Sequence, residues 1–315
     1  MRSVSTTVGG CSHSCLTFIC LCDVCRRTRV MIVFMFLKGC TVIGIFDSGF
    51  GGLTVMRHVV DLLPQYDYVY LGDNARVPYG TRSQSIITRY TEEAVDYLFR
   101  RGCGIIIIAC NTATAFALRN IQESLLPDRY PKRRVLGVVR PSAEEIAEGS
   151  SRAVGILATE GVVQSRAYER EIRTINPEIK VFHEPCPLLV PIIEAGEEDW
   201  EGTELIIDKY VTRLFSQEMT IDTVLLACTH YPLLHDRIRR AVPPDVAVLA
   251  QGPLVARRFQ RYLTRHPEVE GRLPKGGKRL FWTTDTSERF DRLASRFFGE
   301  PVQSQKVFLE PATGS

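Results

Sequence analysis

The sequence lacks several features that would place it in a simple class. No apolar run approaches the roughly 20 residues that a membrane-spanning helix needs, so we expect no membrane partner. Charged residues make up 24% of the 315 residues and hydrophobic residues 45%, which are ordinary values for a globular protein and exclude disorder as the main state. This length is about twice that of a typical ~150-residue domain, which favours two domains.

An excess of basic charge is also missing from the body of the chain. The whole chain has 39 basic and 36 acidic residues, but residues 1–40 alone carry five basic residues and one acidic residue. Residues 41–315 therefore sum to −1, although the whole chain sums to +3. Nothing in this balance indicates a nucleic-acid partner.

Cysteine is scarce outside the first forty residues. Four of the ten cysteines lie beyond residue 40, namely Cys103, Cys110, Cys186 and Cys228. A chain this long does not need disulfides to fold, and scattered cysteines suit a reducing compartment, where a thiol serves packing or chemistry. We therefore expect a cytoplasmic protein.

The first forty residues have a composition of their own. Ser, Thr, Gly and Cys dominate residues 3–25, and a basic stretch and the short apolar run 30–37 follow. Only Cys22 and Cys25 have the spacing of metal ligands, and no second pair follows, so we expect no metal site. We interpret residues 1–40 as an atypical, poorly structured N-terminal extension.

From residue 41 the sequence alternates between strand and helix patterns. Four consecutive isoleucines at 105–108 are typical of a strand that is buried on both faces of a parallel sheet. The alternation predicts an α/β protein with doubly wound parallel sheets. The predicted strands are 42–46, 68–71, 104–109, 135–139, 153–157, 180–183, 223–227, 246–250 and 279–283. The predicted helices are 53–63, 83–100, 112–126, 162 to about 173, 200–215 and one from about 233.

The two halves of this body resemble each other. Gly44 lies 66 positions before Cys110, and Gly155 lies 73 positions before Cys228 in a matching context. We interpret this as a duplicated domain. The first domain would be 41–139 with the C-terminal segment 252–315 returning to it, and the second would be 140–251.

Both cysteines follow a predicted buried strand, where the chain turns into a helix. Ligands of open parallel sheets bind at the carboxyl ends of the strands. Two facing domains would therefore place Cys110 and Cys228 on the walls of one cleft, together with Asp47 and Ser48 at the end of the first strand.

Two facing thiols suit the inversion of a stereocentre. The positive end of a helix lowers the pKa of a thiol beside it, so such a cysteine can act as a base. One thiolate would remove a proton from a tetrahedral carbon and the opposing thiol would return one from the other face, without metal or pyridoxal phosphate. Helix N-termini and nearby hydroxyls would hold the carboxylate of an amino acid. The hydroxyls available are those of Ser48, Thr112, Thr114 and Thr229, and Asp47 and His230 could assist the thiols.

Other interpretations of these residues stay open. A cysteine after a strand is often only a small packed hydrophobe, in which case the protein would be a two-lobed small-molecule binder. Cys228 and His230 could serve a hydrolase, although residues two apart point poorly at each other and no oxyanion-hole motif accompanies them. The glycines at 49–52 do not make a dinucleotide motif, because Thr54 occupies the third glycine position.

Five motifs, in order along the chain, resemble those of glutamate racemases in the aspartate/glutamate racemase superfamily. The match covers roughly residues 41–285. The motifs are Gly44–Val55, Gly72-Asp73-Asn74 with Pro78-Tyr79-Gly80, Ala109–Ala115, Cys186–Pro191 with Glu194, and Ala227–Pro232.

The resemblance implies two similar α/β domains with the active site in the cleft between them. It also implies cofactor-independent interconversion of L- and D-glutamate, which supplies D-glutamate for peptidoglycan in a bacterial cytoplasm. Family members usually form homodimers. Racemisation of another acidic amino acid, chiefly aspartate, is the nearest alternative.

The resemblance also implies a role for each matching residue. Cys110 would exchange the proton on the D-glutamate side and Cys228 on the L-glutamate side. Asp47 and His230 would be auxiliary acid/base groups in contact with the substrate, and Glu194 would assist from the second half. The substrate's α-groups would bind Ser48, Asn111, Thr112, Thr114 and Thr229, and its side-chain end would contact Tyr79 and Gly80.

The chain departs from the family pattern at a few positions. Asn74 stands where many members have Thr, and Gln251-Gly252 replaces the more usual Asp-Ser near the last crossing between domains. Thr284-Asp285-Thr286 lacks a glycine that is often found there. None of these changes touches the two thiols.

Overall fold

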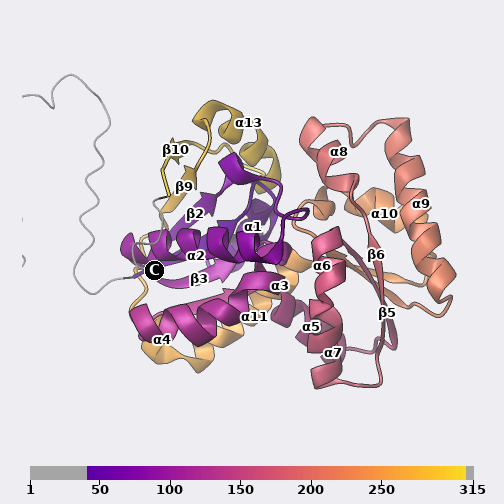
Figure 1. Ribbon diagram of the computed structural model, residues 1–315, viewed down its shortest axis with the longest axis horizontal. Helices are drawn as coiled ribbons and strands as arrows, with labels where there is room; N and C mark the ends of the chain where they lie inside the picture. Colours follow the sequence, from indigo (N-terminus) through magenta and orange to yellow (C-terminus); the bar gives the residue numbers. More distant parts are fainter. Residues whose placement is uncertain (1–40, 310–315) are drawn as a thin grey trace, which may run out of the picture. The chain divides into compact units, whose positions relative to one another are not determined.

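The computed structural model describes residues 41–309, which all fall within one compact unit. The predicted extension and the Cys22–Cys25 spacing lie outside these residues. Two parallel sheets organise the chain (Figure 1), and every strand pairing is parallel, as the sequence predicted.

The first sheet has six strands in the order β10-β9-β2-β1-β3-β4. These strands are β1 (Val42–Asp47), β2 (Tyr68–Gly72), β3 (Cys103–Ile108), β4 (Arg134–Gly137), β9 (Arg279–Thr283) and β10 (Ser304–Lys306). The second sheet has four strands in the order β6-β5-β7-β8. They are β5 (Ala153–Ala158), β6 (Lys180–Pro185), β7 (Thr223–Ala227) and β8 (Ala247–Ala250).

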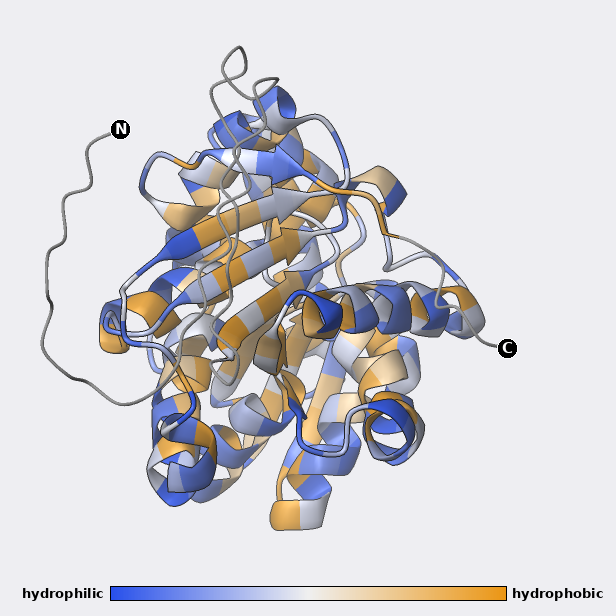
Figure 2. Ribbon diagram, turned by 90° about the vertical axis from the view of Figure 1, so that its left-hand side faces the viewer, coloured by the Kyte–Doolittle hydropathy of each residue, from blue (hydrophilic) through white to orange (hydrophobic). Residues whose placement is uncertain are grey.

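Helices cover both faces of each sheet, because alternate residues of a strand point to opposite faces. On the first sheet, Ile43 and Ile45 of β1 belong to the apolar cluster that contains α1, α11 and α13, whereas Phe46 belongs to the cluster of α2 and α3. On the second sheet, Ile156 faces α5 and α7, and Leu157 belongs to the cluster of α8, α9 and α10. The strands form an apolar interior and the helices are mixed in hydropathy (Figure 2).

The helices have the following bounds. In the first half they are α1 (Gly52–Leu62), α2 (Gln84–Arg100), α3 (Asn111–Asn120), α4 (Leu126–Arg129) and α5 (Val139–Glu148). They continue with α6 (Glu160–Ser165), α7 (Ala167–Ile175), α8 (Leu189–Ala195), α9 (Glu201–Gln217) and α10 (His235–Ala241). The last three are α11 (Gln251–Arg265), α12 (Pro267–Glu270) and α13 (Ser287–Phe298). Short turns are 3₁₀ at Asn74–Arg76 and Tyr231–Leu234, and π-helical at Ile121–Leu125.

Several boundaries differ from those predicted. The helix predicted over 112–126 continues as a π-helical turn and α4, and the helix after residue 160 is split in two by Arg166, whose φ of 51° is left-handed. The sequence analysis missed α5, α8, α11, α12 and α13. In α11 the Gly252-Pro253 pair looks like a helix breaker, but a proline in the first turn removes an N–H that has no helical partner there.

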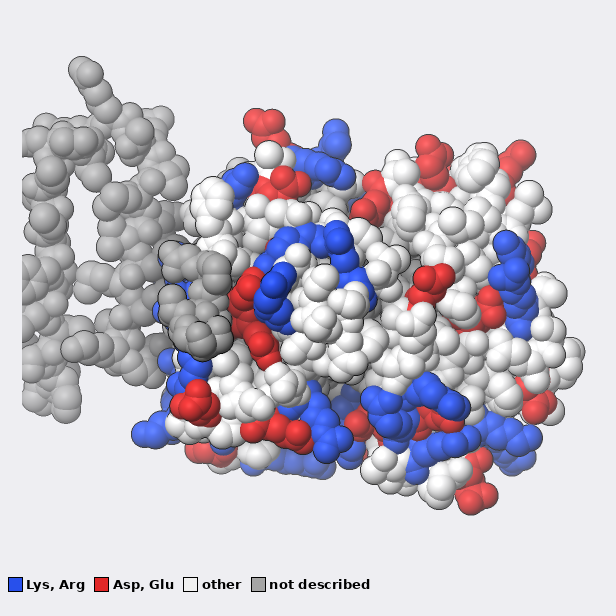
Figure 3. Space-filling view, in the orientation of Figure 1, with Lys and Arg blue, Asp and Glu red and all other residues white. Residues whose placement is uncertain are grey.

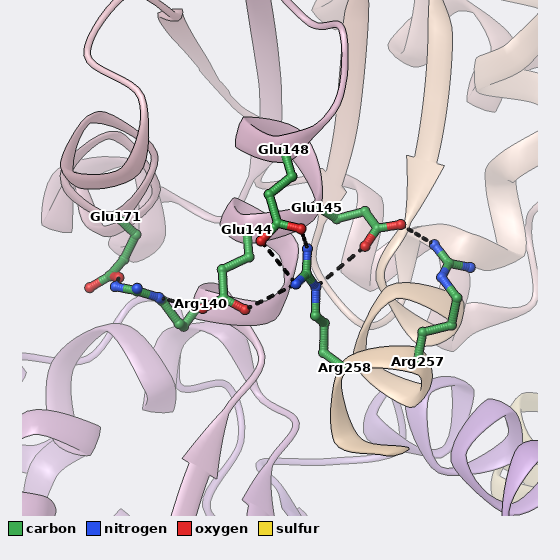
Figure 4. Close-up of polar contacts among 7 residues, drawn as sticks. All are labelled: Arg140, Glu144, Glu145, Glu148, Glu171, Arg257 and Arg258. Carbon is green, nitrogen blue, oxygen red and sulfur yellow. Dashed lines mark hydrogen bonds and ion pairs between the residues drawn. The ribbon is translucent and has the colours of Figure 1, made fainter. Parts of the chain in front are cut away.

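The chain passes between the two sheets through two helices. α5 follows β4 of the first sheet and precedes β5 of the second, and α11 follows β8 and leads back towards β9. Ion pairs join these two connections on the surface: Arg258 lies 2.6 Å from Glu148, and Arg257 lies 2.6 Å from Glu145 (Figure 4). Exposed pairs of this kind contribute little to stability, so the buried contacts between the two helices matter more.

Charges of both signs are interspersed on the face shown in Figure 3, as expected from the balanced charge of residues 41–315. No helix within residues 41–309 combines the length and the apolar character that a membrane span requires.

Close packing of the second sheet against α9 predicts a stability effect at Gly155. A Cβ added to this glycine of β5 would lie 2.5 Å from Cδ2 of the buried Leu214. We expect Gly155→Ala to destabilise the fold by about 1–3 kcal/mol because the core would be overpacked. The melting temperature should fall by roughly 2–4 °C per kcal/mol.

Gly271→Ala is the matched control, because Gly271 is exposed and has the right-handed helical φ of −64° that alanine adopts readily. Its melting temperature should stay near that of the wild type, since such surface changes are within about 0.5 kcal/mol. Equal melting temperatures for the two variants would show that the contact between Gly155 and Leu214 is not tight.

Candidate active site

A cavity of about 350 Å³ lies between the carboxyl ends of strands from the two sheets. Its walls include Ser48 after β1 and Cys110 after β3 from the first sheet, and Thr159 after β5 and Cys228 after β7 from the second. The remaining lining residues are Val77, Pro78, Tyr79, Gly80, Thr81, Asn111, Thr112, Glu160, Cys186, Pro187, Val190, Pro191, Glu194, Thr229 and His230.

Cys110 is the N-cap of α3. Its Sγ accepts a hydrogen bond from the N–H of Ala113 at 3.4 Å and lies 3.4 Å from Oγ of Ser48. Burial and the charge of nearby Asp47 nevertheless raise the pKa of the Cys110 thiol to about 12, against the effect of these two hydrogen bonds. The lowered thiol pKa expected from the helix N-terminus is therefore wrong for Cys110, because desolvation outweighs the helix.

Cys228 has a different partner. Its Sγ lies 4.0 Å from Nδ1 of His230, whose Nε2 lies 3.0 Å from Oε1 of Glu194 on α8. Burial lowers the pKa of His230, but the contacts with Cys228 and Glu194 outweigh burial and raise this pKa to about 10. His230 is therefore protonated at neutral pH, and a positive ring beside a sulfur stabilises its thiolate form.

Asp47 lies beneath the cavity rather than in its wall. Its side chain is fully buried, accepts a hydrogen bond from the N–H of Gly49 at 2.9 Å, and accepts one from the hydroxyl of Thr229 at 3.4 Å. Burial raises the pKa of this carboxyl, and the charge of His230 opposes the rise. Asp47 thus connects the end of β1 with the motif that carries Cys228.

The loop after β1 packs directly on the segment Thr229-His230 that follows β7. A Cβ added to Gly51 would lie 2.2 Å from Oγ1 of Thr229 and 2.5 Å from Nδ1 of His230, so this position accommodates only glycine. Phe297 of α13 contacts the His230 ring edge-on, with ring centroids 5.1 Å apart. These contacts hold the His230 ring between Cys228 and Glu194.

The structure brings most of the predicted site residues to one cavity. Twelve positions were named from the sequence, and ten of them line it: Cys110, Cys228, His230, Glu194, Ser48, Tyr79, Gly80, Asn111, Thr112 and Thr229. Asp47 and Thr114 do not. The hydroxyl of Thr114 donates to the carbonyl of Ile108 at 3.0 Å, so it stabilises the start of α3 instead of facing the cavity.

The sequence analysis missed Thr159 and Glu160, which line the cavity from the second sheet. Thr159 caps α6 and lies 3.2 Å from the hydroxyl of Thr112, across the gap between the two sheets. A signal was available, because Thr159 follows a predicted strand in the same way as the two cysteines. Cys186 also lines the cavity and donates from Sγ to the carbonyl of Glu184 at 3.5 Å.

The four cysteines within residues 41–309 are free and buried. Across the same residues, His, Cys, Asp and Glu side chains form no group of three or more that could hold a metal ion. A buried thiol faces, across one small cavity, a sulfur that is paired with a protonated histidine, which is an arrangement for proton transfer to and from a bound molecule.

Comparison with known proteins shows which family this chain is similar to. The family model described as Asp/Glu/Hydantoin racemase matches residues 43–258. A glutamate racemase from Geobacter metallireducens is 39% identical over 259 residues, covering 82% of this chain and 92% of the relative. One from Koribacter versatilis is 36% identical over 285 residues, covering 84% and 95%.

Solved structures agree with these relatives. Glutamate racemase isoform RacE1 from Bacillus anthracis superposes with a TM-score of 0.77 at 31% identity, covering 85% of this chain and 98% of that one. The glutamate racemase from Francisella tularensis, solved in complex with D-glutamate, has a TM-score of 0.77 at 30% identity, covering 86% and 99%. The chain belongs to the Asp/Glu/Hydantoin racemase family, among its glutamate racemases.

Proposed function

We propose that this protein interconverts L- and D-glutamate by two-base proton transfer between Cys110 and Cys228. The observation that carries the proposal is that the two cysteines, which come from different sheets, line one cavity of about 350 Å³. A small amino acid bound there would have one sulfur on each face of its Cα. Neither step requires a cofactor, because each thiol or thiolate supplies or accepts the proton itself.

The surroundings of the two cysteines support different roles for them. Cys228 beside protonated His230 acts as the base that removes the α-proton of L-glutamate. Cys110, whose thiol keeps its proton because of burial and Asp47, donates to the opposite face and gives D-glutamate. The reverse reaction uses the same groups in the opposite protonation states.

Hydroxyl and amide groups at the strand ends would hold the substrate. Ser48, Asn111, Thr112 and Thr229 line the cavity beside the two sulfurs and would bind the α-groups. Tyr79 and Gly80 would contact the side-chain end, with the hydroxyl of Tyr79 donated to Asp73 at 2.6 Å. Asp47 would act through Thr229, because its carboxylate accepts a hydrogen bond from the hydroxyl of Thr229. Glu194 would act through His230, whose Nε2 it contacts.

The same proposal covers the wider role of the protein. It would supply D-glutamate for peptidoglycan in a bacterial cytoplasm and act as a homodimer. Its first domain would comprise 41–139 together with the C-terminal segment 252–315, and its second would comprise 140–251. The positions of α5 and α11, which connect the two sheets, support this division.

Deuterium exchange tests the proposed function. In D₂O, the purified protein should incorporate deuterium at Cα of either enantiomer of glutamate and produce the other one, with or without EDTA. NMR follows the loss of the Cα proton, and circular dichroism follows racemisation. L-Aspartate is the control substrate. Exchange of aspartate but not glutamate would contradict the proposed substrate, and exchange of neither would contradict an enzyme of this class.

A further inference from the structure

A buried hydrogen-bond network connects the cavity wall to both helices that link the sheets. Asn111 follows Cys110 at the start of α3, and its side chain pairs with that of Gln251, the first residue of α11. The NH₂ group of Gln251 also lies within hydrogen-bond distance of the hydroxyls of Tyr168 on α7 and, at 3.1 Å, of Ser142 on α5. All four residues are at most 3% exposed.

A hydrogen bond from Ser142 to the backbone fixes the orientation of the Gln251 amide. The hydroxyl of Ser142 donates to the carbonyl of Val138 at 2.9 Å, and a carbonyl can only accept. Ser142 therefore has only lone pairs for Gln251, so the NH₂ group of Gln251 must face Ser142 and its Oε1 must face Asn111. Nδ2 of Asn111 then donates to Gln251 Oε1 at 2.5 Å, and the orientation of the Asn111 amide follows from that contact.

Counting donors and acceptors shows what Asn111 can offer a ligand. Its Oδ1 accepts from the hydroxyl of Tyr168 at 2.5 Å and lies 3.1 Å from Nε2 of Gln251, whose two hydrogens are shared among Asn111, Tyr168 and Ser142. One of its two N–H groups is given to Gln251, and among the described residues no partner takes the second. Because Asn111 lines the cavity and its Oδ1 faces Tyr168 and Gln251, the amide offers its remaining N–H to a molecule bound there.

We infer that Gln251 is a positioning residue that, with Tyr168, orients the amide of Asn111 so that its remaining N–H binds a carboxylate of the substrate. The inference rests on the proposed function, and it names the substrate group that this amide recognises. An ammonium group has no lone pair to accept such a hydrogen bond, whereas a carboxylate accepts it well. Gln251 and Tyr168 act through Asn111, since neither lines the cavity.

The variant Gln251→Glu tests this assignment, because it keeps the shape of the side chain but supplies at most one hydrogen where glutamine supplies two. Without the donor, the Asn111 amide loses its fixed orientation. We expect KM for glutamate to rise about tenfold, as for a lost hydrogen bond to a charged group, with kcat within about twofold of wild type. Tyr168→Phe removes one donor to Asn111 Oδ1 and should shift KM in the same direction.

A double-mutant cycle separates positioning from general loss of structure. In an Asn111→Ala background, Gln251→Glu should change KM by less than about twofold, because the residue through which it acts is already gone. Circular dichroism and melting temperature report the folding of each variant. Gln122→Glu is the matched control, since Gln122 donates to the carbonyl of Val135 at 2.8 Å and lies outside the cavity, and its KM should equal that of the wild type.

These measurements distinguish a failure of the positioning role from a failure of the proposed function. If the wild type racemises glutamate but Gln251→Glu and Tyr168→Phe both keep its KM, the positioning role is wrong and the proposed function stands. An equal rise in KM with and without Asn111 would also overturn the inference, because Gln251 would then act by another route. If the wild type does not exchange the Cα proton, the proposed function itself fails.

Discussion

Cys228→Ala should lower racemisation of glutamate by about 10²–10⁴-fold, the range that a positioned acid or base contributes to a proton transfer. Cys110→Ala should do the same. Each face of the substrate's Cα has one sulfur in the proposed mechanism, and an alanine methyl can neither accept nor donate a proton. The rate of change of ellipticity, with either enantiomer as the starting substrate, measures the loss.

The two variants should differ in which enantiomer still exchanges its Cα proton. With Cys228 removed, Cys110 can still take the proton of D-glutamate and return a solvent deuteron to the same face. Cys228→Ala should therefore exchange D-glutamate only, and Cys110→Ala L-glutamate only. NMR in D₂O distinguishes these cases, and an exchange pattern opposite to this one would show that the two sulfurs have been assigned to the wrong faces.

Cys103→Ala is the matched control for both variants. Cys103 is a fully buried thiol at the start of β3, at the opposite end of the strand from Cys110, and it does not line the cavity. Its removal should leave racemisation near the wild-type rate, since it alters packing alone. Wild-type turnover by Cys228→Ala or Cys110→Ala would mean that the two-base mechanism is wrong.

His230→Asn should change the pH dependence of the reaction as well as its rate. In the wild type, the contacts with Cys228 and Glu194 outweigh burial and raise the pKa of His230 to about 10, so the ring stays positive from pH 7 to 9 and supports a thiolate. His230→Asn removes that charge from beside Sγ of Cys228. We expect kcat/KM at pH 7 to fall by about 10²-fold, the lower end of the range for a positioned acid or base.

Wild-type activity should fall as the pH rises past about 10, because His230 loses its proton there. The variant has no ring to deprotonate, so its activity should start lower and show no such fall near pH 10. Because the two enantiomers have equal free energy in water, kcat/KM must change equally in both directions, and measuring both provides an internal check. A fall near pH 10 in both profiles would show that deprotonation of His230 does not control the reaction.

Much of the fold was predictable because its signals are local. The four isoleucines of β3 predicted a buried parallel strand, and the turns after β1, β3 and β7 predicted where side chains would gather. By contrast, α11 was missed because Gly252-Pro253 reads as a breaker unless the helix is known to begin at Gln251. β10 has three residues, two of them exposed, so no pattern of burial predicts it.

Some residues of the candidate site were also predictable from local signals, and others were not. Ser48, Cys110 and Cys228 follow strands, and the rule for ligands of parallel sheets identifies such positions without any family knowledge. Glu194 and Tyr79 lie on α8 and on the loop before α2, where no such rule applies, and only the resemblance to a family predicted them. The pairing of Asn111 with Gln251 joins residues 140 positions apart, and no local pattern encodes it.

The sequence by itself predicted the alternation of strands and helices, the two similar halves and the two cysteines of interest, because these depend on residue spacing and type. The tertiary structure decided the surroundings of those cysteines, and for Cys110 it reversed an expectation. A helix N-terminus alone would lower the pKa of Cys110, but burial and Asp47 raise it, while His230 and Glu194 surround Cys228 with the opposite charge pattern. Desolvation and the distance between charges exist only in the folded chain, so the direction of the pKa shift of Cys110 could not be predicted before it.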